Sequence, residues 1–125
     1  MGYTIFRPDE CDFQTAQRGD QRRSLAPLSE ALHAMRGNIW RLPPGARGGR
    51  HIEHAQEEVF VVLEGTATLL LGDPPERVQL VRGAVAVVET DTGQQLRNES
   101  DAETIVLIIG APPVQGKAEH LPDVD

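Results

Sequence analysis

The sequence contains very little cysteine and no long apolar run. Cys11 is the only cysteine among 125 residues, so no internal disulfide can form, and the composition suits a reducing compartment. The first ten residues lack the apolar core of a secretory signal, and no stretch approaches the roughly 18 apolar residues that span a bilayer. These absences predict a cytoplasmic protein.

Positive charge is also scarce. The chain has 12 Lys and Arg against 19 Asp and Glu, a formal net charge of −7, which repels nucleic acid and anionic membrane surfaces at long range. It contains no phosphate-binding glycine-rich loop, no CxxC pair and no recognisable Ser-His-Asp set. We therefore expect a small-molecule ligand, with neither nucleic acid nor a membrane as a partner.

The pattern of apolar residues predicts an all-β domain. From Asn38 onward, runs of about five to eight apolar or β-branched residues are separated by Gly, Pro, Asp and Asn, which is typical of a sandwich or barrel. The expected strands are NIWRL, EVFVVLE, TATLLL, RVQLV, AVAVVET, QQLRN and TIVLIIG. LGDPPERV and PPGARGG are expected loops, because proline cannot donate to a strand ladder and glycine favours turns.

The chain divides into an arm, a barrel and a tail. Residues 1–35 are expected to form a partly ordered, irregular N-terminal arm, in which LSEALHAMRG fits either a short helix after Pro27 or a bent strand. Residues 36–110 are the expected barrel. Residues 111–125 contain three prolines and are expected to be a tail that is disordered or draped over a surface.

Two expected strands, VFVVL and TIVLII, are apolar on both faces. A strand with one solvated face would alternate, so both faces of these strands are expected to be covered. One face would line the barrel interior, and the other would pack on a second sheet or a neighbouring subunit. We therefore expect a homodimer.

Polar residues that suit a metal are crowded at residues 51–58, directly before an apolar run. In an extended strand, His51 and Glu53 point to one face and His54 to the other. Glu58 shares a face with Phe60 and Val62, so a barrel would place its carboxylate at the mouth of an apolar cavity. Such a buried charge costs several kcal/mol unless a cation or a donor compensates it. His51 and Glu53 can join Glu58 around a divalent ion, at ligand distances of about 2.0 to 2.2 Å.

This region is similar to the first motif of the cupin superfamily, which has a PG turn, His-x-His, three or four residues, Glu, six residues and Gly. Here the match is His51-x-Glu53, four residues, Glu58, six residues and Gly65. Counting three residues back from Glu58 instead places His54 at the second position.

The segment 83–98 resembles the second cupin motif. Gly83 and Asn98 match its ends, whereas Glu89 replaces the motif proline and Asp91 the motif glycine. Gln94 occupies the position of the family's third histidine ligand. The resemblance implies a cupin-type double-stranded β-helix, a jelly-roll-like barrel, whose usual metal ligands are three histidines and one glutamate.

Two metal-ligand sets fit these substitutions. His51, Glu53, Glu58 and Gln94 form an oxygen-rich set that favours hard ions such as Mn²⁺, Mg²⁺ or Fe²⁺. His51, His54 and Glu58 form a set of two histidines and one carboxylate, but their spacing requires a bulge. Geometry favours the first set. The expected cofactor is a divalent metal (Mn, Fe, Ni or Zn), and a site without metal also fits.

Three functions fit this sequence. The first is a metal-dependent enzyme of the dioxygenase, isomerase or decarboxylase type, with Glu58 as a ligand and Glu53 as a general base if it does not bind the metal. The second is a metal-free module that binds or senses a small molecule, and the third is a structural dimer with a vestigial pocket. Glu57 is assigned to the solvated face, and His33 and His120 lie outside both motifs and receive no role.

Overall fold

The computed structural model describes residues 2–18, 21–113 and 118–124. These residues form strands and one short 3₁₀ turn, η1 (Leu28–Ala31). The strands are β1 (Gln14–Arg18), β2 (Gln21–Pro27), β3 (Arg36–Leu42), β4 (His51–Ile52), β5 (Glu57–Glu64), β6 (Thr66–Leu71), β7 (Glu76–Val81), β8 (Val85–Val88), β9 (Gly93–Arg97), β10 (Thr104–Ala111) and β11 (Glu119–His120).

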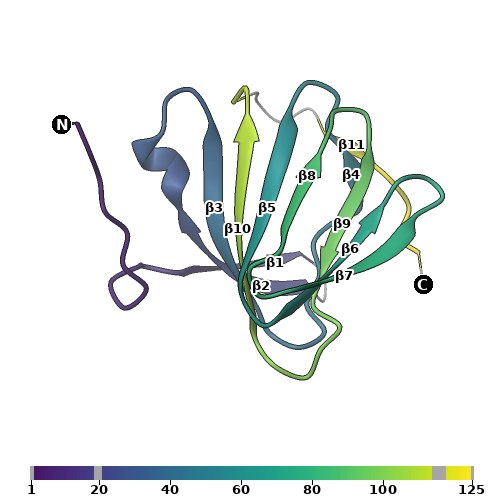
Figure 1. Ribbon diagram of the computed structural model, residues 1–125, viewed down its shortest axis with the longest axis horizontal. Helices are drawn as coiled ribbons and strands as arrows, with labels where there is room; N and C mark the ends of the chain where they lie inside the picture. Colours follow the sequence, from purple (N-terminus) through teal and green to yellow (C-terminus); the bar gives the residue numbers. More distant parts are fainter. Residues whose placement is uncertain (1, 19–20, 114–117, 125) are drawn as a thin grey trace.

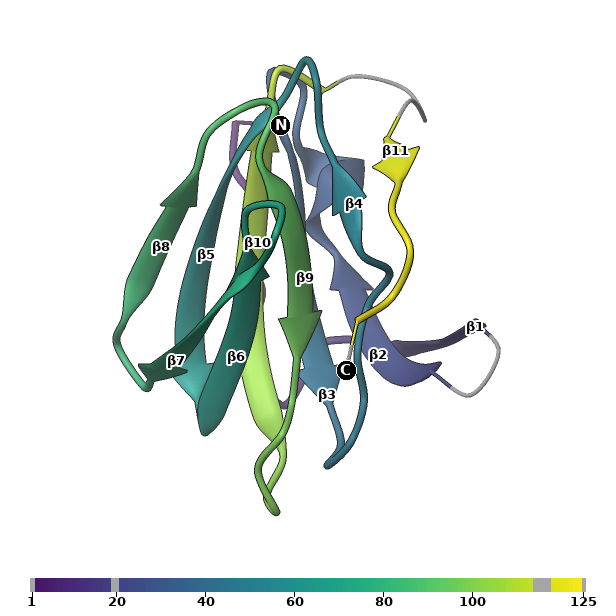
Figure 2. The same ribbon diagram turned by 90° about the vertical axis from the view of Figure 1, so that its right-hand side faces the viewer.

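The strands form two antiparallel sheets that face one another (Figures 1 and 2). The first sheet has the order β1-β2-β3-β10-β5-β8, and the second has the order β11-β4-β9-β6-β7. Strands that are distant in sequence therefore lie side by side, as β3 and β5 do on either side of β10. The expected all-β, barrel-like architecture is confirmed.

The apolar side chains between the sheets form one core. β5 alternates as its sequence predicts, with Glu58, Phe60 and Val62 buried on the inner face. The buried cluster consists of Leu42, Ala46, Phe60, Val62, Ala67, Leu69, Val88 and Val106. Because Glu58 continues the inner face toward the open end of the barrel, its carboxylate lies beside this core.

The motif glycines and Asn98 fix the turns that hold the barrel closed. Gly65 has a φ of 77°, and a Cβ there would lie 2.5 Å from the carbonyl oxygen of Glu103, so only glycine fits without a shift. The Asn98 side chain is buried, and its Nδ2 donates to the carbonyl oxygens of Leu42 and Ala102, each at 2.8 Å. These residues of the two motifs serve the scaffold.

The expected strands are present, but the arm is more regular than the sequence indicated. β1 pairs with β2, and β2 pairs with β3, so residues 14–18 and 21–27 extend the first sheet. The helical alternative for residues 28–36 is not formed beyond η1. Ser29 explains why the helical turn ends at η1. Its hydroxyl is hydrogen-bonded to both the N–H and the carbonyl of Gly37, which closes the segment into a loop.

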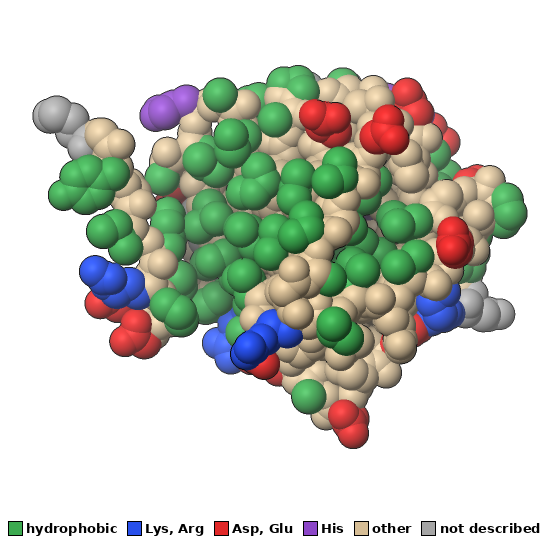
Figure 3. Space-filling model, in the orientation of Figure 1, with side chains coloured by type: hydrophobic (Ala, Val, Ile, Leu, Met, Phe, Trp, Pro, Cys, Tyr) green, Lys and Arg blue, Asp and Glu red, His purple; other side chains and the backbone are tan. Residues whose placement is uncertain are grey.

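The outer face of the first sheet is rich in apolar side chains (Figure 3). Val59 and Val61 of β5 are half-buried, whereas Val85 and Val87 of β8 are 56% and 68% exposed. Within one chain, the outward side of these strands is therefore only partly covered.

Across the described residues, no helix is long and apolar enough to cross a membrane.

Candidate functional site

A cavity of about 210 Å³ opens at the end of the barrel where β5 begins. Its apolar wall is formed by Trp40, Leu42, Phe60, Leu96 and Ile108. Its polar side carries four of the residues singled out in the sequence, His51, Glu53, Glu58 and Gln94. The structure thus brings these four side chains together around a single space.

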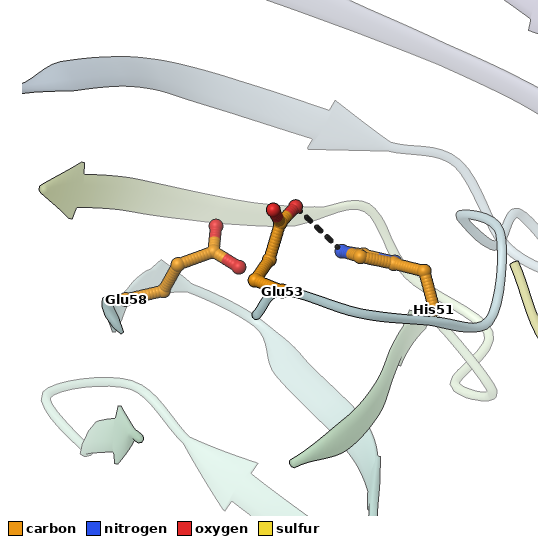
Figure 4. Close-up of side chains that lie close together, drawn as sticks. All are labelled: His51, Glu53 and Glu58. Atoms are coloured by element: carbon orange, nitrogen blue, oxygen red, sulfur yellow. Dashed lines mark ion pairs between the residues drawn. The ribbon is translucent and has the colours of Figure 1, made fainter. Parts of the chain in front are cut away.

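Strand pairing explains how they meet. β4 pairs with β9 so that His51 lies opposite Gln94, and residues directly opposite in an antiparallel pair project to the same face. Glu53 follows β4 directly, and Glu58 is the first inward-facing residue of β5. Figure 4 shows the Glu53 side chain between those of His51 and Glu58.

The His51 ring is oriented by the backbone. Its Nδ1 lies 2.9 Å from the carbonyl oxygen of Gly49, and a carbonyl only accepts, so Nδ1 carries the proton of this hydrogen bond. The other ring nitrogen, Nε2, lies 3.3 Å from a carboxylate oxygen of Glu53. A proton or a metal ion near these two atoms would relieve the repulsion between their lone pairs. A second group that fixes the ring is typical of histidines that bind metals.

Glu58 is buried in the site with only part of its carboxyl group hydrogen-bonded. It is 8% exposed, and among the described residues its Oε1 has no hydrogen-bond partner. Burial raises the pKa of the Glu58 carboxyl, while the hydrogen bond from Gln94 and the charge of His51 act against that rise. The neighbouring Glu53 carboxylate adds to it. Two carboxylates so close together and so little hydrated call for a cation.

The donor set fits a divalent ion. One ligand atom from each of His51, Glu53 and Glu58 lies within 4.8 Å of the others, and one imidazole with two carboxylates is a common ligand set for first-row metals. The buried, unpaired oxygen of Glu58 is the feature that an ion would satisfy. That these residues are metal ligands remains a prediction.

His54 lies outside this cluster, which corrects the alternative ligand set. Its side chain is half-exposed, with Nδ1 2.7 Å from Asp91 and Nε2 2.8 Å from Glu119. The hydrogen bonds to Asp91 and Glu119 raise the pKa of the His54 imidazole. No bulge turns it inward, because residues 54 and 55 form a bend that is held by the N–H of Asp91 donating to the Glu53 carbonyl at 2.9 Å.

The substitutions in the second motif have visible consequences. Asp91, which stands where the family has glycine, adopts a left-handed φ of 64°, and aspartate tolerates this conformation better than most residues. Gln94 is buried at 3% exposure, and its amide donates to Glu58. It therefore supports a carboxylate where the family pattern has a third imidazole.

Two further residues at the cavity mouth were not identified from the sequence. Arg36, at the start of β3, lines the cavity, and its charge lowers the pKa of Glu58. His120 also lines it, from β11. No local pattern marks either residue, because both positions depend on pairing between distant strands.

Comparisons with known proteins agree with this architecture. A family model described as "Cupin domain" matches residues 38–110. Auxin-binding protein 4 of Zea mays is 33% identical over 81 residues, which are 58% of this chain and 39% of the maize protein. The chain thus spans well under half the length of that relative.

Two solved structures show the same fold. A sugar phosphate isomerase from a cupin superfamily, from Silicibacter pomeroyi, is 27% identical with a TM-score of 0.74, covering 86% of this chain and 75% of that one. A predicted oxalate decarboxylase from Thermotoga maritima is 21% identical with a TM-score of 0.77, covering 87% of this chain and 99% of that one. The family match, the two facing sheets and the polar cluster at the barrel mouth together show that this chain belongs to the cupin domain family.

Proposed function

We propose that this protein is a divalent-metal-dependent enzyme that moves a proton between neighbouring carbons of a small oxygenated metabolite, as an isomerase does. The observation that carries the proposal is the cluster of His51, Glu53 and Glu58, in which a buried carboxylate oxygen, unpaired within the described chain, faces the cavity.

We assign His51 and Glu58 to the ion. Each is held by a second group, His51 by the Gly49 carbonyl and Glu58 by the Gln94 amide, and such support fixes the direction of a ligand atom. When bound, the ion supplies Lewis acidity toward a carbonyl or hydroxyl oxygen of the ligand. Gln94 acts here as a positioning residue.

We assign the proton transfer to Glu53. Its carboxylate lies between the two ion-binding side chains and lines the cavity. It takes a proton from the hydroxyl-bearing carbon next to a carbonyl and returns it to the carbonyl carbon. The hydroxyl proton moves to the former carbonyl oxygen, so that the hydroxyl-bearing carbon becomes the new carbonyl. Bonds and electrons balance without an external oxidant or reductant.

The cavity limits the substrate to a small molecule. Its volume of about 210 Å³ lies below the roughly 300 to 1,000 Å³ of pockets that take drug-sized ligands. The aromatic side chains of Trp40 and Phe60 form part of the wall and exclude water from one side of the ligand. The likeness to a protein described as a sugar phosphate isomerase supports a hydroxylated substrate.

The test combines ion binding with isotope exchange. Chelator-treated protein is titrated with Mn²⁺, Fe²⁺, Ni²⁺ or Zn²⁺ by calorimetry, and the loaded protein is incubated with small aldoses, ketoses and their phosphates in D₂O. We expect one ion per chain, and deuterium at the carbon next to the carbonyl, detected by NMR. Glu53→Gln should bind the ion within a few-fold of the wild type and lose the exchange. Glu57→Gln, which changes the exposed neighbour of Glu58, should behave as the wild type.

Other outcomes separate the competing functions. Exchange that survives in Glu53→Gln would remove the assigned base. Loss of the ion from that variant would make Glu53 a ligand instead. Consumption of O₂ or release of CO₂ by the loaded protein, without exchange, would overturn isomerisation in favour of dioxygenation or decarboxylation.

A metal-free binding module is the second candidate, and Gln94 is the observation that favours it. Gln94 donates to Glu58, and His51 lies beside Glu53, so a protonated His51 would neutralise part of the cluster without an ion. A protein that binds a small polar ligand in the presence of a chelator, and takes up no metal, would support this module and refute the enzyme.

A further inference from the structure

His120 lies beyond the residues that match the family, yet it reaches the cavity. The family match ends at residue 110, whereas β11 contains Glu119 and His120. β11 pairs with β4 so that His120 stands opposite His51, just as His51 stands opposite Gln94 on β9. Such partners project to one face with Cβ atoms about 4.5 to 5.5 Å apart. His120, His51 and Gln94 therefore form a row across three strands, and all three line the cavity.

The residues on either side of His120 point the other way, which fixes its direction. Glu119 accepts a hydrogen bond from Nε2 of His54 at 2.8 Å on the outer surface. Leu121 lies over Gly93, where a Cβ would be 3.4 Å from the Leu121 side chain. The alternation expected of an extended strand thus directs the His120 side chain to the cavity side.

Buried cations of the barrel hold this segment in place. The side chain of Arg50 is 4% exposed, and its Nη1 donates to the Pro122 carbonyl at 3.0 Å. The side chain of Arg97 is 7% exposed, and its Nη2 donates to the Val124 carbonyl at 2.5 Å. Burying two guanidinium groups is unfavourable unless each is well paired. Their donation to residues 122 and 124 makes the segment an integral part of the barrel wall.

We propose that His120 is a further ligand of the divalent ion and supplies a second imidazole, which neither His54 nor Gln94 provides. The proposal rests on the metal dependence proposed above. Two imidazoles on directly opposite residues of an antiparallel pair are close enough to bind one ion. In the structure the His120 side chain is exposed at the mouth, outside the compact cluster of His51, Glu53 and Glu58, and it joins the ion by turning inward.

This ligand changes the metals that the site selects. His51 and Glu58 alone offer one nitrogen and carboxylate oxygen, a combination that hard ions such as Mg²⁺ and Mn²⁺ accept. A second imidazole shifts preference toward Fe²⁺, Ni²⁺, Zn²⁺ and Cu²⁺. It also leaves Glu53 available for proton transfer.

The number of coordinated imidazoles can be counted directly. Cu²⁺ is added to the chelator-treated, full-length protein, and pulsed electron paramagnetic resonance detects the remote ring nitrogens of bound imidazoles. We expect two imidazoles in the wild type and one in His120→Ala. The matched control is His33→Ala, which removes another exposed histidine and should retain two. Ion-free His120→Ala should melt close to the wild type, because the side chain is exposed.

Affinities provide an independent measurement. Loss of a group that only orients a ligand typically lowers metal affinity about 10- to 100-fold, so loss of a direct ligand should lower Ni²⁺ or Zn²⁺ affinity at least tenfold. Mg²⁺ affinity should change far less. A wild type with a single bound imidazole, or equal Ni²⁺ affinity in His120→Ala, would overturn the role of His120 and leave the proposed function intact. A wild type that binds no metal would overturn the proposed function itself.

Discussion

Replacing Glu58 by glutamine should stabilise the ion-free protein. The Glu58 carboxylate is 8% exposed, and Oε1 has no partner in the described part of the chain. An unsatisfied buried polar atom costs about 1 to 3 kcal/mol, and more when it is charged. Glutamine has nearly the same shape, keeps an oxygen that can accept from Gln94, carries no charge, and replaces the unpaired oxygen by an amide nitrogen beside the Glu53 carboxylate, which only accepts. We expect the free energy of unfolding to rise by about 1 to 2 kcal/mol, and the melting temperature by about 3 to 10 °C.

With a divalent ion present, the wild type should become more stable than Glu58→Gln. At an ion concentration about 100 times the dissociation constant, the wild type gains about 2.7 kcal/mol by mass action, whereas Glu58→Gln loses a ligand and gains little. Differential scanning calorimetry with chelator and with Mn²⁺ measures both effects. Glu57→Gln is the control, because this exposed side chain should change stability by less than about 0.5 kcal/mol in either condition.

The pH dependence follows from the same burial. Because burial raises the pKa of the Glu58 carboxyl, the folded protein keeps this proton to a higher pH than the unfolded chain does. Wild-type stability therefore falls as the pH rises from the ordinary glutamate value through the raised one. The advantage of Glu58→Gln grows over that window and is constant above it. A variant that is less stable than the wild type without metal, or that keeps the full ion-induced gain, would refute this reasoning.

Three further predictions concern the scaffold. Gly65→Ala should lower the free energy of unfolding, measured in urea, by about 2 to 5 kcal/mol, because it adds a backbone clash to a left-handed φ. Gly45→Ala, which has a left-handed φ but open space around it, should lower it by only about 1 to 2 kcal/mol. Equal losses in the two variants would contradict this reasoning. Two carboxylate partners raise the pKa of His54, so its stabilising contribution is full below about pH 6.5 and is lost as the pH rises through the raised value. The difference in melting temperature between the wild type and His54→Ala should therefore shrink as the pH rises, and a difference that grows with pH would contradict this. The outer face of the four adjacent strands β3, β10, β5 and β8 covers about 500 Å² by strand spacing and rise, so two copies would bury about 1,000 Å², the lower limit of stable interfaces. We expect analytical ultracentrifugation to show a homodimer, and the double variant Val85→Lys, Val87→Lys to be monomeric. A monomeric wild type would refute this prediction.

The barrel and most of the site could be predicted because their signals are local. Alternation alone identified Glu58, Phe60 and Val62 as one inward face, and the structure buries all three. The same period separated His51 and Glu53 from His54, which lies on the opposite surface. Motif spacing then placed Gln94 beside them.

The rest depended on contacts between distant residues. The N-terminal arm is polar and shows no clear period, yet it forms β1 and β2 because β3 offers an unpaired edge. His120 acquires its position only through pairing with His51, 69 positions earlier in the chain by residue number. No window of neighbouring residues carries that information.

Arg50 and Arg97 have a consequence for how the protein can diverge. These anchors belong to the barrel, and they grip residues 122 and 124 mainly through main-chain oxygens, which every amino acid provides. A substitution at position 120 therefore leaves these contacts in place, together with those that the Asp123 side chain makes with Arg47 and Gln95. If His120 is the ligand proposed above, descendants of this chain could acquire a different metal preference through substitution at this one position, without any new requirement on the folding of the remaining strands.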